Sequence, residues 1–542
     1  MMINVEKSCF FCAKICGSKC IAEAVDFWKK VWYYFGMMSA GLPDLRSNGA
    51  IRNYKPISKV VRGFGRGENM FRDDFVWGVA SSAYQVEGTD PVNVRGKCIW
   101  DTFSEENPFN TKGGNGLVAC DHMHRYKEDF AMMKELGIKS YRFSINWCRI
   151  LPNGTGEVSE EGIAFYRDLI SSMIENGITP YLTLYHWDLP QALEDKGGWV
   201  NPEIVDAFGN YAKIVAERFS DLVEYFFTIN EPQCVIGLGY VVGVHAPGKK
   251  LGYKETTQAS VNLLKAHGTA VKALRKYAVR PIKIGYAPTC TVPIPATDSP
   301  EDIEAARKKY FLTTKNTWNW AWTVAWFSDP VLLGRFPEDS LEIFKGEMPE
   351  ITEEDLELMH QPIDFLGQNI YNGYYIKAGA DGEPVDVEKY PGYQETGVHW
   401  PIMEECLYWG ARFAYERYKL PIFITENGMA CHDAISLDGK VHDPNRVDFL
   451  DRYLSALQQA VDDGVDVRGY FLWSVMDNFE WDQGYHGRFG IVYTDFVTLK
   501  RIPKDSAYWY KEIMESNGAK LAINNGLWKR SARWQREDSS NV

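Results

Sequence analysis

The sequence has no uninterrupted apolar stretch that approaches the roughly 20 residues of a membrane-spanning helix. It is also poor in positive charge, because its 542 residues include 59 Lys and Arg against 72 Asp and Glu, a net charge of −13. Such a chain is a poor partner for the phosphate backbone of nucleic acids. We therefore expect neither a membrane nor a nucleic acid among its partners.

The cysteines give no sign of a disulfide framework. Their number, 11, is odd, whereas such frameworks favour even counts in short secreted chains. No small-residue cleavage site follows the apolar run at residues 31–38, so we identify no secretory signal. Free, buried thiols in a reducing compartment explain the distribution better, and we expect a cytoplasmic protein. Seven cysteines stand singly, mostly in apolar segments: Cys98, Cys120, Cys148, Cys234, Cys290, Cys406 and Cys431.

Charge and periodicity divide the chain into three zones. Residues 1–69 carry 11 Lys and Arg against 5 Asp and Glu, which leaves a charge of −19 for the rest. Residues 70–518 are periodic and rich in aromatic residues, which form 14% of the whole chain. Residues 519–542 lose this periodicity and end in a polar stretch. We predict a poorly ordered N-terminal extension, one folded domain and a C-terminal tail, with these boundaries.

Four cysteines of the N-terminal zone have a spacing that is open to two interpretations. Cys9, Cys12, Cys16 and Cys20 resemble the ligands of an iron–sulfur cluster or a zinc ion. Their intervals of three, four and four residues also trace one face of a helix. We favour the helix, predict no metal site, and expect the extension to be dispensable.

Short strand-like runs alternate with long amphipathic helical patterns through the middle zone. The runs are bounded by Gly, Pro, Asn or Asp, and they are residues 76–80, 138–145, 179–185, 224–229, 282–288, 363–370, 421–425 and 467–474. Apolar residues recur at helical intervals between them, as in residues 124–136, 160–176, 202–219 and 446–463. Eight strand–helix units predict an α/β fold, a single (β/α)₈ TIM barrel with long βα loops. A doubly wound sheet with insertions would produce the same alternation.

Two glutamates follow apolar strands in matching contexts. Glu231 comes directly after the fourth predicted strand and Glu426 directly after the seventh, each beside an Asn and a chain-breaking residue. In a (β/α)₈ barrel, reacting groups lie where strands run into βα loops. Two carboxyl groups at one barrel mouth suit glycoside cleavage, one as the acid and the other as the nucleophile or base. Each Glu taken alone is also explained as a helix cap.

Further polar and aromatic residues gather at the predicted strand ends. This mixture suits a sugar, whose hydroxyl groups need hydrogen-bonding partners and whose C–H face packs on an indole ring. A single such residue is more often part of the core, so their joint placement carries the interpretation. They are Gln85, Glu87, Arg142, His186, Trp187, Asp188, Asn369, Tyr371, Trp473, Glu480, Trp481 and Phe489.

Several segments in the same order resemble glycoside hydrolase family 1, the β-glucosidase family. They include YRFSINWCRILP (141–152), LYHWDLPQAL (184–193), TINEP (228–232), ITENG (424–428), FLWSVMDNFEW (471–481) and GYHGRFGIVYTDF (484–496). The resemblance implies a retaining β-glycosidase on a (β/α)₈ barrel that needs no cofactor and no metal. It favours a β-glucosidase that releases terminal non-reducing β-D-glucosyl residues by double displacement.

The resemblance also implies a role for each matching residue. Glu231 would be the acid/base and Glu426 the nucleophile, which Arg142 and Tyr371 would orient and keep ionised. The remaining matches would bind the substrate: Gln85, His186, Asn230, Glu480 and Trp481 at the glycone hydroxyls, Trp473 under the sugar ring, Phe489 in the same pocket, and Trp400 at the entrance to the leaving-group subsite.

Glu480 bears on the choice of substrate. Relatives that cleave 6-phosphoglycosides need cationic or hydroxyl groups at the phosphate, which a charged Glu480 would repel. We therefore expect unphosphorylated small-molecule or oligosaccharide β-glycosides as partners, glucosides first and galactosides or fucosides after them. A transglycosidase that uses the same glycosyl-enzyme, an inactive sugar-binding homologue and a homo-oligomer remain open.

Overall fold

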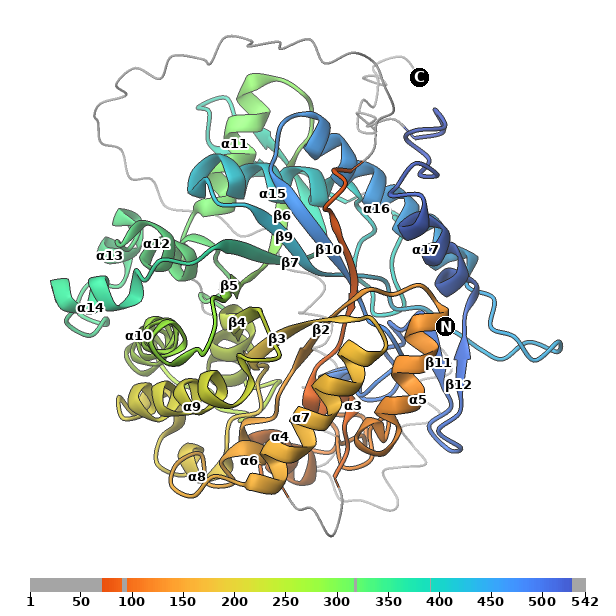
Figure 1. Ribbon diagram of the computed structural model, residues 1–542. Helices are drawn as coiled ribbons and strands as arrows, with labels where there is room; N and C mark the ends of the chain where they lie inside the picture. Colours follow the sequence, from red (N-terminus) through yellow and green to blue (C-terminus); the bar gives the residue numbers. More distant parts are fainter. Residues whose placement is uncertain (1–70, 90–94, 316–318, 390, 529–542) are drawn as a thin grey trace, which may run out of the picture. The chain divides into compact units, whose positions relative to one another are not determined.

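The computed structural model describes residues 71–89, 95–315, 319–389 and 391–528 (Figure 1). The predicted N-terminal extension with its four cysteines lies outside the described residues, and so do residues 529–542 of the predicted tail.

Eight parallel strands close into a barrel. Following the hydrogen-bonded order, they are β5 (Lys283–Ala287), β4 (Tyr225–Asn230), β3 (Thr179–Tyr185), β2 (Ser140–Ser144), β1 (Val76–Ala80), β10 (Val467–Trp473), β9 (Ile422–Asn427) and β7 (Phe365–Ala378). A parallel pairing between β5 and β7 completes the ring. The predicted (β/α)₈ barrel is therefore confirmed, and the doubly wound alternative is excluded because the sheet has closed on itself.

Alternating side chains of each strand point to two different cores. On β3, Tyr181 points into the barrel, whereas Leu182 and Leu184 pack outside it against the helices. Aromatic rings fill the barrel interior, among them Tyr181, Phe227, Phe365, Phe423 and Phe471. Gly285 makes room for one of them, because a Cβ atom there would lie 2.0 Å from the ring of Phe365.

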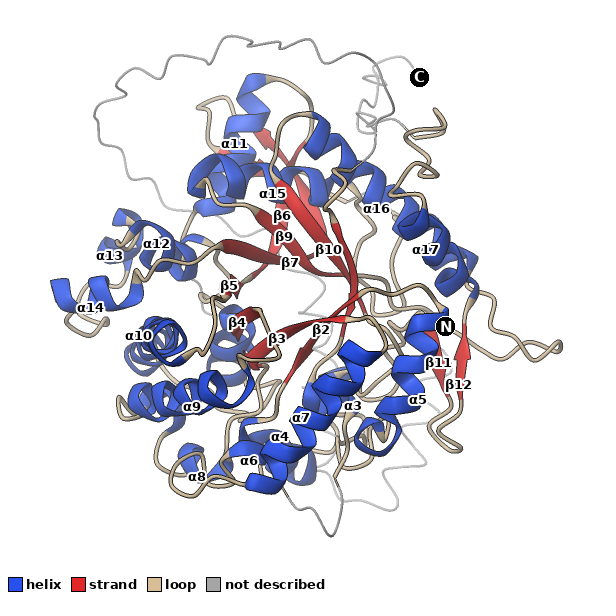
Figure 2. Ribbon diagram, in the orientation of Figure 1, coloured by secondary structure: helices blue, strands red, loops and turns tan. Residues whose placement is uncertain are grey.

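Helices surround the strands, as Figure 2 shows in blue around the red barrel. On α9 (Ile204–Phe219), buried Val205, Phe208, Ala212 and Phe219 form the apolar stripe that faces the strands. The other long helices are α5 (His122–Glu135), α7 (Glu160–Glu175), α10 (Tyr253–Tyr277), α11 (Pro300–Phe311), α15 (Glu405–Tyr418), α16 (Pro444–Asp462) and α17 (Asp505–Glu515). Shorter ones are α3 (Ala83–Val86), α4 (Ile99–Glu106), α6 (Trp147–Ile150), α8 (Gln191–Glu194), α12 (Ala325–Leu333), α13 (Glu338–Ile343) and α14 (Glu353–Met359), with single turns at Gly198–Val200 and Trp481–Gln483 and a π-helix at Cys234–Val242.

Four of the strands in the described ranges lie outside the predicted set. The strand β6 (Thr289–Pro295) pairs with the second half of β7, which is why β7 runs beyond the predicted residues 363–370. Two prolines, Pro293 and Pro295, hide β6 from sequence patterns, because proline is tolerated only at the edge of a sheet. The others are β8 (Pro384–Asp386), which also pairs with β7, and the hairpin of β11 (Val492–Thr494) and β12 (Arg501–Pro503).

The packed chain continues past Gly518 to Trp528. Leu521 is fully buried, and the Ala522 N–H donates to Asp451 on α16 over 2.7 Å. Gln458 and Asn524 exchange side-chain hydrogen bonds. The first ten residues of the predicted tail therefore belong to the surface of the barrel.

Two further observations concern membrane-spanning helices and the state of the cysteines. Among the described helices, none has the length and apolar character needed to cross a bilayer. The seven cysteines in the described ranges are free, and all are buried except the half-buried Cys431.

Candidate active site

The predicted site residues come together at the carboxyl ends of the barrel strands. Gln85 lies on α3, Arg142 on β2, His186 just after β3, Asn230 and Glu231 at the end of β4, Tyr371 on β7, Glu426 on β9 and Trp473 at the end of β10. Glu480, Trp481 and Phe489 lie between β10 and β11, and Trp400 lies between β8 and α15. All are buried or half-buried except Trp400, which is 36% exposed.

Glu426 is held by one donor on each carboxylate oxygen. Arg142 Nη1 lies 2.5 Å from Glu426 Oε1, and the Tyr371 hydroxyl donates to Glu426 Oε2 over 2.8 Å. Arg142 is fully buried and comes from β2, which β1 and β10 separate from β9, so its guanidinium group reaches Glu426 within the barrel and cannot move to solvent. The arrangement fixes the direction of the carboxylate and stabilises its charge.

Glu231 has neutral donors instead. The side-chain N–H of Asn369 donates to Glu231 Oε1 over 2.7 Å, and the Cys234 thiol donates to Oε2 over 3.0 Å. The Thr425 hydroxyl donates to Asn369 Oδ1 over 2.6 Å and so fixes which way the Asn369 amide faces. Glu231 is thus oriented firmly without a cation among its hydrogen-bonding partners.

Asn230 joins the surroundings of the two glutamates. Its Oδ1 atom accepts from Arg142 Nη2 over 2.6 Å and from Asn369 Nδ2 over 3.0 Å. Arg142 contacts Glu426 and Asn369 contacts Glu231, so Asn230 completes a continuous chain of hydrogen bonds between the two carboxyl groups. The position of either glutamate therefore depends on the other.

The two glutamates differ in how firmly they hold a proton. Burial and then the negative charge of Glu426 raise the pKa of Glu231 to about 7. Burial raises the pKa of Glu426 too, but Arg142 and Tyr371 oppose that rise. Because the cation contacts Glu426, the pair carries its proton on Glu231 and its negative charge on Glu426. A catalytic acid and a nucleophile would need this difference.

His186 is a neutral imidazole of fixed tautomer. Burial, with the charge of Arg142, lowers its pKa well below the usual range. Asn230 uses its Oδ1 for two donors, so its Nδ2 donates to His186 Nε2 over 3.1 Å. The ring proton therefore lies on Nδ1, for which the described residues supply no partner. The ring stacks between Trp473 and Trp481, which leaves this N–H as a donor for a ligand hydroxyl.

Comparisons with known proteins decide the family. The sequence model of glycosyl hydrolase family 1 matches residues 67–519. The chain belongs to this family. As a family 1 member, the protein is a glycoside hydrolase, which hydrolyses O-glycosyl bonds. The family predicted from the sequence motifs is confirmed.

Curated relatives and solved structures of family 1 agree over the same part of the chain. Beta-glucosidase A of Acetivibrio thermocellus is 44% identical over 457 residues, 83% of this chain and 99% of the relative. Beta-glucosidase A of Thermotoga maritima is 43% identical over 450 residues, 83% of this chain and 98% of the relative. A solved structure of a family 1 β-glucosidase from Thermotoga maritima has a TM-score of 0.76 at 42% identity and covers 83% of this chain and 100% of its own. The structure of that organism's β-glucosidase with glucoimidazole, at 42% identity and the same coverage, has a TM-score of 0.75.

Gln85 and Glu480 form a further polar part of the site, next to Trp473. Gln85 Nε2 donates to the Phe479 carbonyl over 2.9 Å and reaches Glu480 Oε2 at 3.4 Å, where the Trp473 indole N–H also arrives. Burial, with Glu426 and Asp482 nearby, raises the pKa of Glu480 well above its usual range, and Trp473 opposes only part of this rise. Glu480 is therefore harder to ionise than an exposed glutamate. The expectation that its charge repels a phosphate stays a prediction.

The aromatic residues form the walls and the rim. Trp481 packs against Trp187 and Trp100, with ring centroids 4.7 and 4.5 Å apart. Trp400 lies at the rim, 5.2 Å from the ring of Tyr371 and 5.8 Å from that of Phe489. In the described ranges, no group of three or more His, Cys, Asp or Glu side chains is arranged to hold a metal ion.

Two strand-end residues that suggested a sugar site have other partners. Glu87 accepts from Tyr166 over 2.6 Å and forms an ion pair with Arg149, and Asp188 accepts from the Trp147 backbone. These contacts stabilise the packing behind the site.

Cys234, Thr425 and Asn478 belong to the site but were not identified from the sequence. Cys234 comes three residues after Glu231, close to one helical turn, and that spacing is the only signal that could have indicated their contact.

Proposed function

We propose that the protein is a β-glucosidase that releases terminal non-reducing, unphosphorylated β-D-glucosyl residues by double displacement with retention. The observation that carries the proposal is the difference in pKa and in hydrogen-bonding partners between the two glutamates at the carboxyl ends of the barrel strands. Glu426 is held as a carboxylate by Arg142 and Tyr371, and Glu231 beside it has a pKa of about 7. The β-glucosidases that are 44% and 43% identical to this chain support the choice of glucose.

In the first step, Glu426 attacks the anomeric carbon while Glu231 gives its proton to the departing oxygen. The bond from the sugar to the leaving group breaks as the ester bond to Glu426 forms. Arg142 and Tyr371 aim the attacking carboxylate, and Asn369 and Cys234 hold the acid. The substrate thus leaves as an alcohol, and a glycosyl-enzyme remains.

In the second step, Glu231 acts as a base. Esterification removes the negative charge of Glu426, which is one of the causes of the raised pKa of Glu231. Glu231 therefore gives up its proton more readily, takes one from a water molecule, and directs that water at the anomeric carbon. The ester breaks, glucose leaves with its original configuration, and Glu231 is protonated again.

The remaining predicted residues hold the sugar. The Nδ1 proton of His186, the amide of Gln85 and the carboxyl of Glu480 offer donors and acceptors to hydroxyl groups, with Asn230 and the Trp481 indole beside them. Trp473 and Phe489 supply apolar surface for the ring. Trp400, at the exposed rim, supports a leaving-group subsite outside the buried glycone site.

Product analysis tests the mechanism. Hydrolysis of 4-nitrophenyl β-glucoside followed by proton NMR should show β-glucose first, with the α-anomer appearing only by later mutarotation. Glucose that appears first as the α-anomer would contradict double displacement. A product mixture dominated by transfer to added alcohol would show a transglycosidase instead.

We also propose a cytoplasmic location. The free, buried cysteines of the described chain support it, since free thiols persist in reducing compartments. Fractionation of the source cells with an antibody to the protein tests this, and recovery in the secreted fraction would contradict it.

A further inference from the structure

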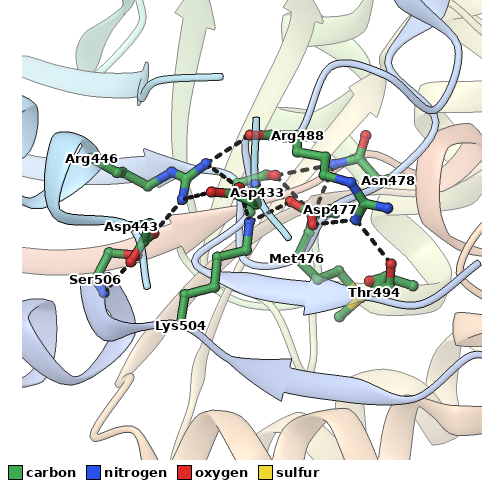
Figure 3. Close-up of polar contacts among 12 residues, drawn as sticks. Asp433, Asp443, Arg446, Met476, Asp477, Asn478, Arg488, Thr494, Lys504 and Ser506 are labelled. Carbon is green, nitrogen blue, oxygen red and sulfur yellow. Dashed lines mark hydrogen bonds and ion pairs between the residues drawn. The ribbon is translucent and has the colours of Figure 1, made fainter. Parts of the chain in front are cut away.

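Six charged side chains form a buried cluster beside the proposed active site (Figure 3). Figure 3 shows them as one connected set of hydrogen bonds and ion pairs. They are three carboxylates and three cations, so their formal charges cancel. The members of this six-charge cluster are Asp433, Asp443, Arg446, Asp477, Arg488 and Lys504, and all but Arg488 are almost wholly buried.

Lys504 lies at the centre of the six-charge cluster. Its Nζ atom is 2.6 Å from Asp433 Oδ2 and 2.7 Å from Asp477 Oδ1. Although burial alone would raise the pKa of Asp433, Lys504 and then Arg446 hold it below its usual range. Lys504 precedes α17 in the sequence, so a residue outside the barrel strands joins two loops of the barrel mouth.

On one side, the six-charge cluster reaches the segment that follows Glu426. Arg446 Nη2 lies 2.7 Å from Asp433 Oδ2, and Arg446 Nε donates to the Met429 carbonyl over 3.1 Å. Met429 is three residues after Glu426. Asp443 forms an ion pair with Arg446 and accepts from the backbone and hydroxyl of Ser506, which anchors the arginine to the start of α17.

On the other side, the six-charge cluster holds segment 474–491, which carries Glu480, Trp481 and Phe489. Asp477 Oδ1 accepts from the Gly490 N–H over 3.0 Å, and its Oδ2 lies 2.7 Å from Arg488 Nη1. Asp477 and Arg488 therefore close the segment into a loop with Phe489 at its base. A Cβ atom at residue 490 would lie 2.1 Å from the Asp477 nitrogen, so only glycine allows this approach.

The hydrogen bonds continue from Asp477 to the sugar site through the next residue. Asn478 Oδ1 accepts from Gln85 Nε2 over 3.0 Å, and the same nitrogen lies 3.4 Å from Glu480 Oε2. Arg446 also donates to the Arg488 carbonyl over 2.8 Å, which ties the two segments directly to each other. The six-charge cluster thus contacts both segments and acts on the site through them.

Burying six charges needs a reason other than stability. Well-packed apolar side chains would stabilise the fold as well, because the desolvation of ions offsets most of their mutual attraction. Ion pairs and charge-assisted hydrogen bonds differ from apolar contacts in being directional, so they define one relative position of the groups they join. Removing Lys504 leaves three carboxylates with two cations, and the loops must move to solvate the uncompensated negative charge.

We propose that Lys504 is a positioning residue for the glycosidase reaction. It fixes segment 474–491, with the glycone-binding Glu480 and Trp481, relative to segment 427–433, which follows the nucleophile Glu426. The assignment rests on the proposed function, because that function defines which groups must be aligned. Lys504 itself lies behind the site and acts through Asp433 and Asp477.

The test compares Lys504→Met with a control at another ion pair whose carboxylate is buried. Methionine keeps much of the length of lysine and removes the charge. The control is Arg417→Met, which takes the cation from the buried Asp329 between α12 and α15. Three quantities are measured where circular dichroism shows every variant folded: kcat/KM for 4-nitrophenyl β-glucoside, the Kd of deoxynojirimycin by calorimetry, and hydrogen exchange of peptides from residues 474–491 by mass spectrometry.

We expect Lys504→Met to lower kcat/KM and deoxynojirimycin affinity at least tenfold and to speed exchange in residues 474–491. Arg417→Met should lower Tm while leaving all three quantities within twofold of wild type. A folded Lys504→Met protein within twofold of wild type in all three would overturn the proposal. If Lys504→Met does not fold, Asp477→Asn decides by the same criteria, because it keeps an acceptor for Gly490 and loses the charge and the acceptor for Arg488.

The exchange measurement separates this proposal from the proposed function. A wild-type protein that does not cleave glucosides would refute the function. Faster exchange of residues 474–491 in Lys504→Met, and not in Arg417→Met, would still establish that Lys504 holds this segment.

Discussion

Replacing Tyr371 with phenylalanine should move the acid limb of the pH profile. Only ionised Glu426 attacks and only protonated Glu231 donates, so kcat/KM falls below the pKa of Glu426 and above that of Glu231. The pKa of Glu231, about 7, places the alkaline decline near neutrality. Tyr371 donates to Glu426 Oε2 over 2.8 Å and stabilises its charged form, which lowers the pKa of Glu426.

The size of the effect follows from that hydrogen bond. A hydrogen bond to a charged group contributes about 1.5–3 kcal/mol, and 1.36 kcal/mol corresponds to one pH unit. Tyr371→Phe destabilises the carboxylate and leaves the neutral acid almost unchanged, so the acid limb should rise by about one to two pH units. Because the alkaline limb stays near 7, the active range should become narrower and its maximum lower.

The assay is kcat/KM for 4-nitrophenyl β-glucoside across pH 4–9, from initial rates at low substrate with product read after quenching in alkali. The control is Tyr375→Phe on the same strand, whose hydroxyl contacts Glu405 at 3.3 Å, outside the site residues. It should leave both limbs in place. An acid limb that stays or falls in Tyr371→Phe would refute the assignment of Tyr371 as a stabiliser of ionised Glu426.

Four further predictions concern Glu426, Glu231, the substrate and residues 1–69. Glu426→Ala should abolish turnover with the fold intact, and azide should restore some rate and yield the α-glucosyl azide; wild-type-like activity in a clean preparation would refute the nucleophile. Glu231→Ala should lose far more rate on an alkyl glucoside than on dinitrophenyl glucoside, whose leaving group needs little protonation, and equal losses would reduce Glu231 to a binding residue. Glucosides and galactosides should be hydrolysed and 6-phosphoglucosides not, because carboxyl groups surround Glu480; a higher kcat/KM for the phosphorylated substrate would contradict this. A chain that begins at Met70 should keep its kcat/KM and nearly its Tm, and a tenfold loss of activity or a loss of several degrees would show that residues 1–69 contribute to the enzyme.

The barrel could be predicted because its strands are short, apolar and bounded by turn residues. Each of the eight predicted runs overlaps a barrel strand, and the ends differ by a few residues, except at the longer β7. The pattern failed at β6, where Pro293 and Pro295 obscure a strand that tertiary pairing with β7 stabilises. It also failed at residues 519–528, whose attachment depends on single contacts such as Ala522 with Asp451.

The site could be predicted only as a set of strand-end residues. The sequence places Glu87 just after a barrel strand, as it does the site residues. In the structure, however, its carboxylate contacts Arg149 and Tyr166 behind the site. The raised pKa of Glu480 depends on its burial and on the nearby charge of Glu426, which lies far from Glu480 in the sequence. Cys234 contacts Glu231 within one turn, and only its position three residues after Glu231 distinguishes it from the other buried thiols.

The two prolines of β6 also bear on how readily the protein aggregates. β6 ends the path of the sheet, and among the described strands only β7 pairs with it. Its residues are buried except the half-buried Thr291. An unpaired edge can template a strand from another molecule and start aggregation. Pro293 and Pro295 have no backbone N–H to offer such a strand, which makes this edge a poor starting point for fibrils. The burial of β6 and its two prolines are therefore expected together to help the enzyme stay dispersed at high concentration.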